Sequence, residues 1–171
     1  MSFKTTLIAA LVAAPFALPA FAGSEISIED PYAISSGMTA MAGAAFFTIH
    51  NAGDEDDRLV GAEADVSKLV QLHTHIISDD GVARMVEVPE GFPVPAGGDH
   101  VLMRGGDHVM FMGLNGPFEQ DQIIPLTLIF EKAGRIEVDV PVDFERAAAA
   151  MPGMQMGAGP MNGNGNMGGS N

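Results

Sequence analysis

Apolar and polar residues alternate along much of this chain with the two-residue period that is typical of β-strands. In the segment 136–142, isoleucine and valine alternate with acidic residues or proline, which predicts a strand with one buried face. The apolar run 126–130 precedes this segment, and the intervening residues 132–134 read Lys-Ala-Gly. A turn at these residues predicts that the two strands form a hairpin.

Two earlier apolar runs are punctuated by turn residues in the same way. The run 44–50 ends at Asn-Ala-Gly, and the run 69–77 is followed by Asp-Asp-Gly at 79–81. Several short strands with glycine, proline and aspartate between them are typical of an antiparallel sandwich or barrel. A helical turn is expected at most within 62–69, and no pattern indicates βαβ units. The predicted fold class is therefore a single all-β domain.

The first 22 residues have the features of a secretory signal peptide. Lys4 precedes the apolar run 7–18, which is too short to span a bilayer, and two prolines disfavour an uncleaved anchor helix. Residues 20–22 read Ala-Phe-Ala, which places small residues at the −3 and −1 positions of a cleavage site. We therefore expect cleavage after Ala22 and an exported mature protein without a membrane anchor.

The C-terminal segment 147–171 differs in composition from the rest of the chain. It contains no charged or aromatic residue, so it cannot bury enough apolar surface to offset the entropy lost on ordering. We predict a disordered tail over 147–171 and a folded domain over 23–146. The methionines of the tail admit two interpretations, compositional drift or soft metal ligands on a flexible arm. They are Met151, Met154, Met156, Met161 and Met167.

Composition and charge exclude several classes of protein. The chain has 22 acidic and 8 basic side chains and a net charge of −14, which opposes binding to nucleic acid. It has no cysteine, and therefore no disulfide, thiolate nucleophile or iron–sulfur cluster. No Ser/His/Asp or carboxylate set has a spacing typical of a hydrolase, so we expect that the protein is not an enzyme. The unusual feature that remains is 12 methionines beside 5 histidines.

Histidine and methionine occur together with the spacing of strand residues. His73 and His75 are two residues apart, and His108, Met110 and Met112 alternate in the same way. If both segments are extended, the members of each set lie on one face of their strand.

The turn at 79–81 decides whether Met85 joins the histidines. A two-residue loop pairs Met85 with Ile76 and points the thioether to the other face. A three-residue loop, a type I turn with a G1 bulge at its glycine, pairs Met85 with His75 and leaves it diagonal to His73. The sequence Asp-Asp-Gly favours the second register.

Imidazole nitrogen and thioether sulfur together form a soft, neutral set of ligands. Such a set suits Cu(I) better than Zn(II), Mg(II) or Ca(II). A thioether carries no proton at biological pH and cannot be lost to disulfide formation in an oxidising compartment. One methionine on a strand is usually packing, but this combination of pairs in a cysteine-free exported chain favours a copper site.

These residues resemble the periplasmic copper chaperones called PCu(A)C. The similarity covers about 26–142 and is most specific in the segment 105–114, Gly-Gly-Asp-His-Val-Met-Phe-Met-Gly-Leu. The other matching segments are 70–73, 81–85, 95–98, 124–128 and 130–131. The resemblance implies a cupredoxin-like β-barrel that lies in the periplasm and binds one Cu(I). Carried over by position, the ligands are His73, Met85, His108 and Met110.

The resemblance also implies partners and a mode of action. Members of the family pass Cu(I) toward the copper centres of cytochrome oxidase, so the expected partners are the copper-bearing oxidase subunit, a Sco-type thiol protein, or both. Transfer is expected to proceed by ligand exchange from a monomeric chaperone. An acidic surface can steer a basic patch on the partner. The alternative function is a periplasmic copper buffer or resistance protein that stores Cu(I) with its methionine-rich tail.

The chain departs from the family pattern between the first two ligands. Eleven residues lie between His73 and Met85, where the family has about ten, and the favoured register places His75 opposite Met85. His75 is therefore kept as a second donor or a substitute for His73. Auxiliary ligands are considered at Met112 and in the tail, where a second copper ion could bind as Cu(I) or Cu(II). The tail positions considered are Met151, Met154 and Met156.

The remaining histidines and methionines are expected to have other roles. His100 lies in a second copy of Gly-Gly-Asp-His-Val and is expected not to be a ligand, whereas His50 is expected to be structural or solvated. Met103 is expected to be packing. Met38 and Met41 lie in a loop that either approaches the site or packs on the barrel. Blue-copper electron transfer is excluded because it requires a cysteine thiolate.

Overall fold

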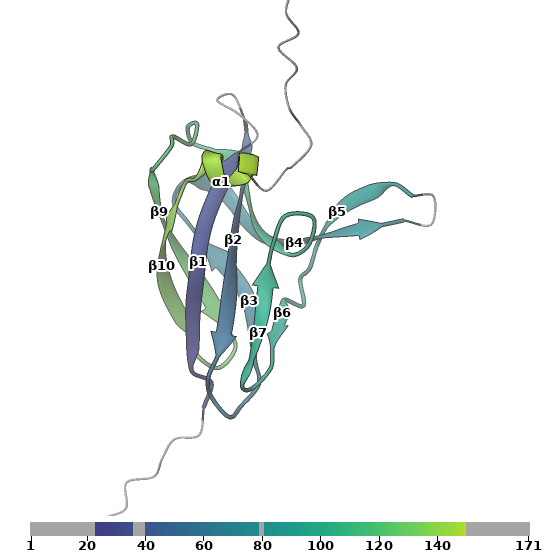
Figure 1. Cartoon of the computed structure of the whole chain (residues 1–171), viewed down its shortest axis with the longest axis vertical. Helices are drawn as coiled ribbons and strands as arrows, with labels where there is room; N and C mark the ends of the chain where they lie inside the picture. The colour runs from purple at the N-terminus through teal and green to yellow at the C-terminus, as the bar shows by residue number, and fades with distance from the viewer. Residues whose placement is uncertain (1–22, 36–39, 79–80, 150–171) are drawn as a thin grey trace, which may run out of the picture.

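The computed structural model describes residues 23–35, 40–78 and 81–149. These residues form two antiparallel β-sheets that face each other and one short helix, as Figure 1 shows. The predicted all-β class and antiparallel sandwich are thereby confirmed. The predicted signal peptide 1–22 and residues 150–171 of the tail lie outside the described residues.

The larger sheet has the strand order β1-β2-β8-β4-β5, and β7 also pairs with β2. Its strands are β1 (Ile26–Ser35), β2 (Ala42–Asn51), β4 (Ser67–Ile77), β5 (Ala83–Glu87), β7 (Gly98–Leu102) and β8 (His108–Leu114). The smaller sheet has the order β10-β9-β3-β6. Its strands are β3 (Asp57–Glu63), β6 (Phe92–Val94), β9 (Ile123–Phe130) and β10 (Arg135–Pro141).

The two sheets enclose one hydrophobic core built from the alternating apolar residues. The predicted hairpin is β9–β10, in which Phe130 N donates to Gly134 O at 2.7 Å. The side chains of Ile49, Leu59 and Phe111 are fully buried. The helical turn expected within 62–69 is wrong, because β3 ends at Glu63 and β4 begins at Ser67.

The short helix α1 (Phe144–Ala149) closes one end of the sandwich. It extends past residue 147, the predicted start of the tail, because alanine has the highest helix propensity. Arg146 pairs with Asp30, with Nη1 at 2.6 Å from Oδ1, and its guanidinium lies 4.2 Å from the centre of the Tyr32 ring. The helix is therefore fastened to β1. No helix in the described part of the chain is long and apolar enough to cross a membrane.

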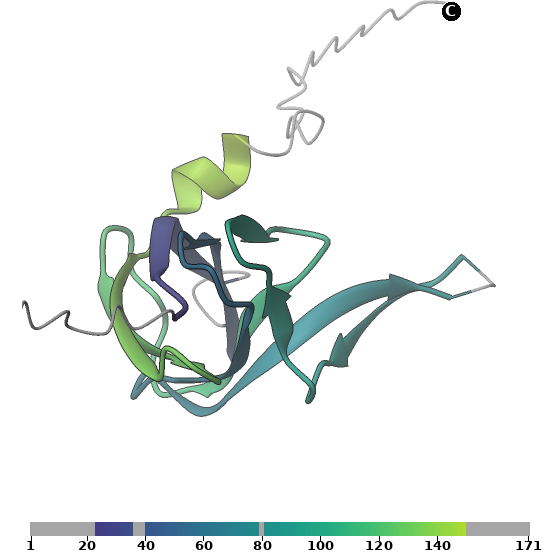
Figure 2. The ribbon, with the colours of Figure 1, turned by 90° about the horizontal axis from the view of Figure 1, so that it is seen from below.

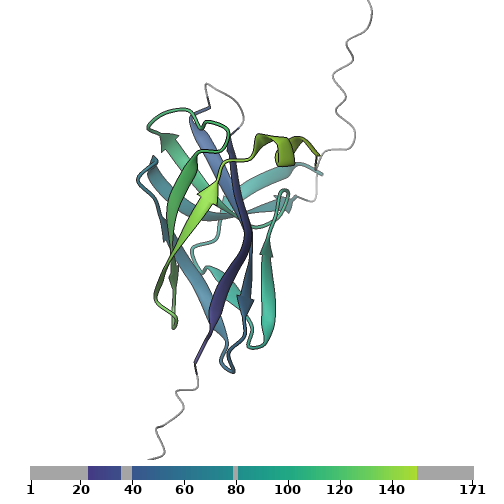
Figure 3. The same cartoon turned by 60° about the vertical axis from the view of Figure 1, so that its left-hand side comes forward.

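The sheets adjoin where β10 leads into α1. Figure 3 shows β10 beside β1, and a bridge between Ala33 and Val142 joins the two edges. Asp143 N then donates to Ala33 O at 3.0 Å. The end of the smaller sheet thus positions the helix against β1.

Strands β7 and β8 follow one another along β2 and are separated by the loop 103–107. Leu102 pairs with Phe47 and Val109 pairs with Ala45. The loop and His108 therefore stand opposite one residue of β2, Phe46. This large interruption places a loop on the outer face of the sheet, at the first residue of β8.

The β4–β5 hairpin extends beyond the rest of the larger sheet, as Figures 1 and 2 show. Strand β8 begins opposite His73, so the residues 74–77 of β4 pair with β5 alone. The hairpin and the loop 103–107 consequently flank the start of β8 from two sides.

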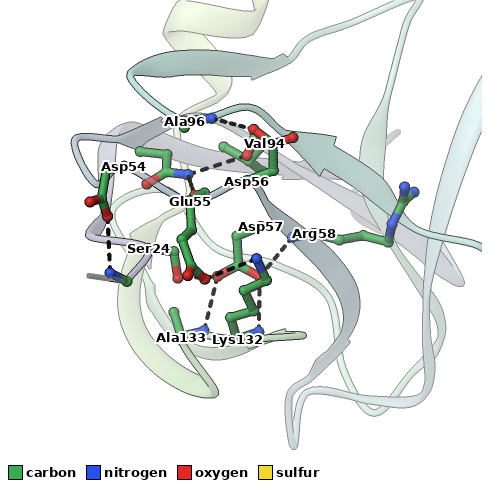
Figure 4. A network of polar contacts seen from close by, with 12 residues as sticks. Ser24, Asp54, Glu55, Asp56, Asp57, Arg58, Val94, Ala96, Lys132 and Ala133 are labelled. Atoms are coloured by element: carbon green, nitrogen blue, oxygen red, sulfur yellow. Dashed lines mark hydrogen bonds and ion pairs between the residues drawn. The ribbon is translucent and has the colours of Figure 1, made fainter. Parts of the chain in front are cut away.

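The carboxylate of Asp57 holds together the strand ends shown in Figure 4. It accepts hydrogen bonds from Ser24 Oγ at 2.5 Å, Arg58 N at 2.7 Å, and Lys132 N and Ala133 N at 2.9 Å each. Burial alone raises the pKa of Asp57, but these four donors outweigh it and hold the pKa below its usual value. Asp57 thus joins the N-terminal segment, β3 and the β9–β10 turn.

We expect Asp57→Ala to lower the free energy of unfolding by about 2–4 kcal/mol at pH 7, because it leaves buried donors unpaired. Since the folded pKa is depressed, the deficit is full above about pH 4 and shrinks as the pH falls through the folded pKa. Urea denaturation of both proteins between pH 7 and pH 3 measures this deficit. The control Asp56→Ala removes an exposed carboxylate and is expected to cost under about 1 kcal/mol. Equal losses for the two variants would contradict this role of Asp57.

Candidate metal site

Three histidines gather on the outer face of the larger sheet. His73 of β4 lies directly opposite His108 of β8, and their ring centroids are 6.0 Å apart. The ring of His75, on the same face of β4, lies 5.2 Å from that of His108. His108 is only 1% exposed although it points away from the core. The loop 103–107 and the overhanging hairpin cover it.

Met85 is the cross-strand partner of His75. The turn that sets this register has Gly81 at φ 77°, and Ser78 N donates to Val82 O at 3.0 Å. The register predicted from the turn sequence is therefore confirmed, although Asp79 and Asp80 lie outside the described residues. Met85 lies diagonal to His73 on the same face, and 44% of its surface is exposed.

A cavity of about 630 Å³ opens beside this cluster. Histidine and thioether groups line one part of it and apolar side chains from β1 and β2 line another. The lining residues are Tyr32, Ile34, Ala44, Phe46, His75, Met85, Met103, Arg104, Gly105 and His108. His75, Met85 and His108 therefore face the cavity, whereas His73 and Met110 do not line it.

Met110 and Met112 share the face of His108 but lie successively farther along β8. Met110 pairs with Ala44 and with Gln71, next to the histidine cluster. Met112 pairs with Leu69, away from the cavity. The structure therefore brings Met110 to the edge of the cluster and keeps Met112 at a distance.

Hydrogen bonds fix the tautomers of the two innermost imidazoles. His108 Nδ1 lies 2.9 Å from Gly106 O, and His73 Nε2 lies 3.2 Å from Gln71 Oε1. Both oxygens accept, so both nitrogens carry the proton and the opposite ring nitrogen keeps its lone pair. In the described part of the chain, His108 Nε2 and His73 Nδ1 are both buried without a hydrogen-bond partner. A buried unpaired nitrogen is costly, so a ligand for these lone pairs would relieve both atoms.

The environment keeps these imidazoles uncharged. Burial lowers the pKa of His108, and the nearby His75 and His73 lower it further against the Gly106 carbonyl. Burial also lowers the pKa of His73, with an opposing effect of Glu87. Both rings are therefore neutral at pH 7. Neutral imidazole is the form that binds a metal ion.

The donors fit a soft cation. Over residues 23–35, 40–78 and 81–149, no group of three or more His, Cys, Asp or Glu side chains is arranged to hold a metal ion. The cluster instead combines two imidazole lone pairs with the thioethers of Met85 and Met110. Uncharged nitrogen and sulfur donors of this kind match Cu(I).

The structure also places the residues for which other roles were expected. His50 bridges Asp99 and Glu29 at 2.5 and 2.7 Å, and thus has the predicted structural role. Met41 is 66% exposed, and its carbonyl accepts from Gly113 N, at the opposite end of β8 from His108. Met38 and the tail positions Met151, Met154 and Met156 lie outside the described residues.

Sequence reasoning missed the wall of the cavity. Met103, expected to be packing, is 57% exposed and lines the cavity, so that expectation is wrong. Its loop contains Gly105 at φ 82°, and the sequence Arg-Gly-Gly before His108 could have signalled a turn at this point. Tyr32 and Phe46 were missed because apolar residues on the outer face of a sheet give no signal distinct from the core.

A protein-family model described as "LpqE-like: Putative lipoprotein LpqE-like" matches residues 26–142. A relative from Leifsonia xyli subsp. xyli, described as "Putative lipoprotein Lxx21020", is 36% identical over 126 residues, which is 73% of each chain.

Solved structures with a similar fold include PCuAC domains. The "Copper-bound PCuAC domain from PmoF2" matches with a TM-score of 0.58 and 23% identity, over 72% of this chain and 96% of that one. The "Solution structure of CuI-DR1885 from Deinococcus Radiodurans" matches with a TM-score of 0.52 and 31% identity, over 68% of this chain and 78% of that one.

We expect His50 to titrate above the ordinary histidine pKa of about 6.5, and His73 and His108 below it. The carboxylates of Asp99 and then Glu29 raise the pKa of His50, whereas burial lowers the pKa of the other two. NMR titration of the ring protons in the metal-free protein measures all three.

The same shifts act on stability in opposite directions. The contribution of His50 is full below about pH 6.5 and is lost as the pH rises through its folded pKa. The contribution of His108 falls as the pH drops from about 6.5 through its lower folded pKa. A His108 ring that titrates at or above 6.5 would contradict its burial as a neutral group.

Proposed function

The chain belongs to the LpqE-like family, and on that premise we propose that it is a periplasmic copper chaperone that delivers Cu(I) to the copper centres of respiratory oxidases. Its fold is that of a PCuAC domain described as copper-bound and of a protein described as CuI-DR1885. The proposed ligands are His73, Met85, His108 and Met110.

One observation carries this proposal. His73 Nδ1 and His108 Nε2 are buried without a hydrogen-bond partner, on opposite residues of neighbouring strands. A protein that had no ligand for these atoms would gain by replacing either ring with an apolar side chain. The thioethers on the same face complete a neutral donor set.

The site has an inner and an outer part, which suits transfer by ligand exchange. His73 and His108 form the inner pair, while His75 and Met85 form a pair on the overhanging hairpin with Met85 44% exposed. In the proposed mechanism an incoming ligand first replaces the thioether of Met85 and then the imidazoles one at a time. A thiolate of a Sco-type partner can complete the exchange because it binds Cu(I) more strongly than thioether or imidazole.

The proposed compartment and partners follow from charge and composition. The N-terminal sequence has the features of a cleaved signal peptide. The matching family and the Leifsonia relative both carry the description "Putative lipoprotein". The sequence has no cysteine, so a lipid attached through a cysteine thiol is not part of the proposal. The chain has a net charge of −14, and cleavage after Ala22 removes Lys4 and no acidic residue. An acidic monomer of this kind would steer toward a basic patch on an oxidase subunit or Sco-type protein, less so at high salt.

We expect His108→Ala and Met110→Leu each to weaken Cu(I) binding by more than about 100-fold, beyond the 10- to 100-fold that loss of a supporting contact costs. The measurement is an anaerobic Cu(I) titration of the chain against a competing chelator. The control is His50→Phe, which removes a histidine from the same sheet outside the cavity and is expected to leave the affinity for Cu(I) unchanged. His100 is not used as a control because its side chain contacts Asp107 in the loop of the site. Tight binding that persists in both ligand variants would overturn the proposed site.

The choice between the β4 histidines is tested in the same way. We expect His73→Ala to lower the affinity for Cu(I) more than His75→Ala, because His73 has the buried unpaired nitrogen. His75→Ala is expected to slow transfer to a thiol-bearing acceptor while the titrated affinity changes less. A larger loss of affinity with His75→Ala would make His75 the ligand in place of His73.

The copper buffer remains a second candidate, and the position of helix α1 favours a role for the tail. Arg146 lies over Tyr32, which lines the cavity. The predicted tail, which starts at residue 147, therefore directly follows a side chain that contacts the wall of the site. Methionines on such a tether have a high effective concentration at the cavity, and they could hold a second copper ion as Cu(I) or Cu(II).

We expect deletion of 150–171 to lower the number of Cu(I) ions bound per chain and to leave the tightest site unchanged. Copper analysis after desalting and the chelator titration measure these two quantities. Replacing the five tail methionines with leucine keeps the length of the tail and controls for the loss of chain. If the number of bound ions is the same in all three proteins, the tail has no part in storage.

A further inference from the structure

The loop 103–107 forms one wall of the cavity and is closed by three contacts. Met103 N donates to Asp107 O at 2.9 Å, and Gly106 N donates to Met103 O at 3.0 Å. The third contact comes from the strand before the loop, where His100 Nε2 lies 2.9 Å from Asp107 Oδ2. A carboxylate oxygen accepts, so His100 is the donor. These contacts fix the path of the backbone between β7 and β8.

The carbonyl of Gly106 faces two imidazoles of the site. It accepts from His108 Nδ1 at 2.9 Å, and His75 Nδ1 lies 3.4 Å from it. A free neutral imidazole in water exchanges between two tautomers. A fixed carbonyl at Nδ1 instead keeps the proton on that atom and directs Nε2 into the cluster.

His100 is itself held in place on the opposite side of the sheet. It pairs with the core residue Ile49 of β2, and its ring stacks on Phe92 with centroids 5.1 Å apart and planes at 13°. It does not line the cavity. Its contact with Asp107 therefore reaches the site through the loop and not through a ligand.

We propose that His100 and Asp107 are positioning residues, which hold the Gly106 carbonyl so that His108 presents Nε2 to the metal. His100 holds the Asp107 carboxylate, and this contact helps to keep the loop 103–107 closed. The closed loop positions the Gly106 carbonyl, which sets the tautomer of His108. The two copies of Gly-Gly-Asp-His-Val in the sequence thus have different tasks. The second histidine, His108, is the proposed ligand, and the first, His100, holds Asp107, which precedes His108.

The test uses His100→Phe, which keeps a ring to stack on Phe92 and removes the donor to Asp107. In the metal-free protein, long-range ¹H–¹⁵N NMR is expected to show His108 change from one tautomer, protonated at Nδ1, to a mixture of both. In an anaerobic titration with Cu(I) alone against a chelator, affinity is expected to fall about twofold for an equal mixture, because only the Nδ1-protonated form presents Nε2 to the metal. His100→Gln, whose amide can donate to Asp107, is expected to restore the single tautomer in part.

Two further variants keep the inference falsifiable. Asp107→Asn weakens the same contact without altering β7 and is expected to change the tautomer of His108 in the same direction, should His100→Phe fail to fold. His50→Phe disturbs β7 through Asp99 and is expected to leave the tautomer unchanged. A single Nδ1-protonated tautomer in both His100→Phe and Asp107→Asn would overturn the inference.

The Cu(I) part of this inference rests on the proposed function, whereas the tautomer does not. A mixed tautomer in His100→Phe, together with unchanged Cu(I) affinity in His108→Ala, would leave the positioning role standing and would overturn the choice of His108 as ligand.

Discussion

The site depends on keeping one nitrogen of each of two imidazoles out of water on the outer face of a sheet. Such a face is ordinarily solvated when the other face packs on a core. Here the loop 103–107 and the overhang of β4 and β5 cover it, so His108 is as buried as a core residue. Burial keeps the rings uncharged, leaves one nitrogen of each without a partner and excludes water from it. The chemistry of the site follows from this coverage more than from any single ligand.

Much of the fold and part of the site could be predicted from the sequence because the deciding signals are local. The two-residue period identified the strands, and Asp-Asp-Gly at 79–81 identified the register that pairs His75 with Met85. Turn conformation is set by a few residues and propagates along a hairpin. A local signal of this kind therefore fixes a contact between side chains ten residues apart.

The remainder of the site depends on contacts between distant segments. Met103 lines the cavity because the contact between His100 and Asp107 holds its loop closed. The apolar part of the cavity lining comes from Tyr32 and Phe46, which lie on other strands. The alternation of a strand shows which residues share a face but not whether another segment covers that face. The extension of α1 past residue 147 has a different cause, since local alanine propensity outweighed a prediction based on the composition of the whole tail.

The two histidines on one face of β4 have a consequence for how this protein can vary in evolution. When the strands of an antiparallel hairpin slip by two residues, each side chain stays on its face of the sheet, whereas a slip of one residue moves it to the other face. From the observed register, a slip of two that lengthens the loop would bring His73 opposite Met85 in place of His75. An imidazole therefore meets the thioether in either register. An insertion of two residues at the tip is therefore tolerated at the level of the donor pair. A slip of two in the other direction would instead place Ile77 opposite Met85 and lose the pair.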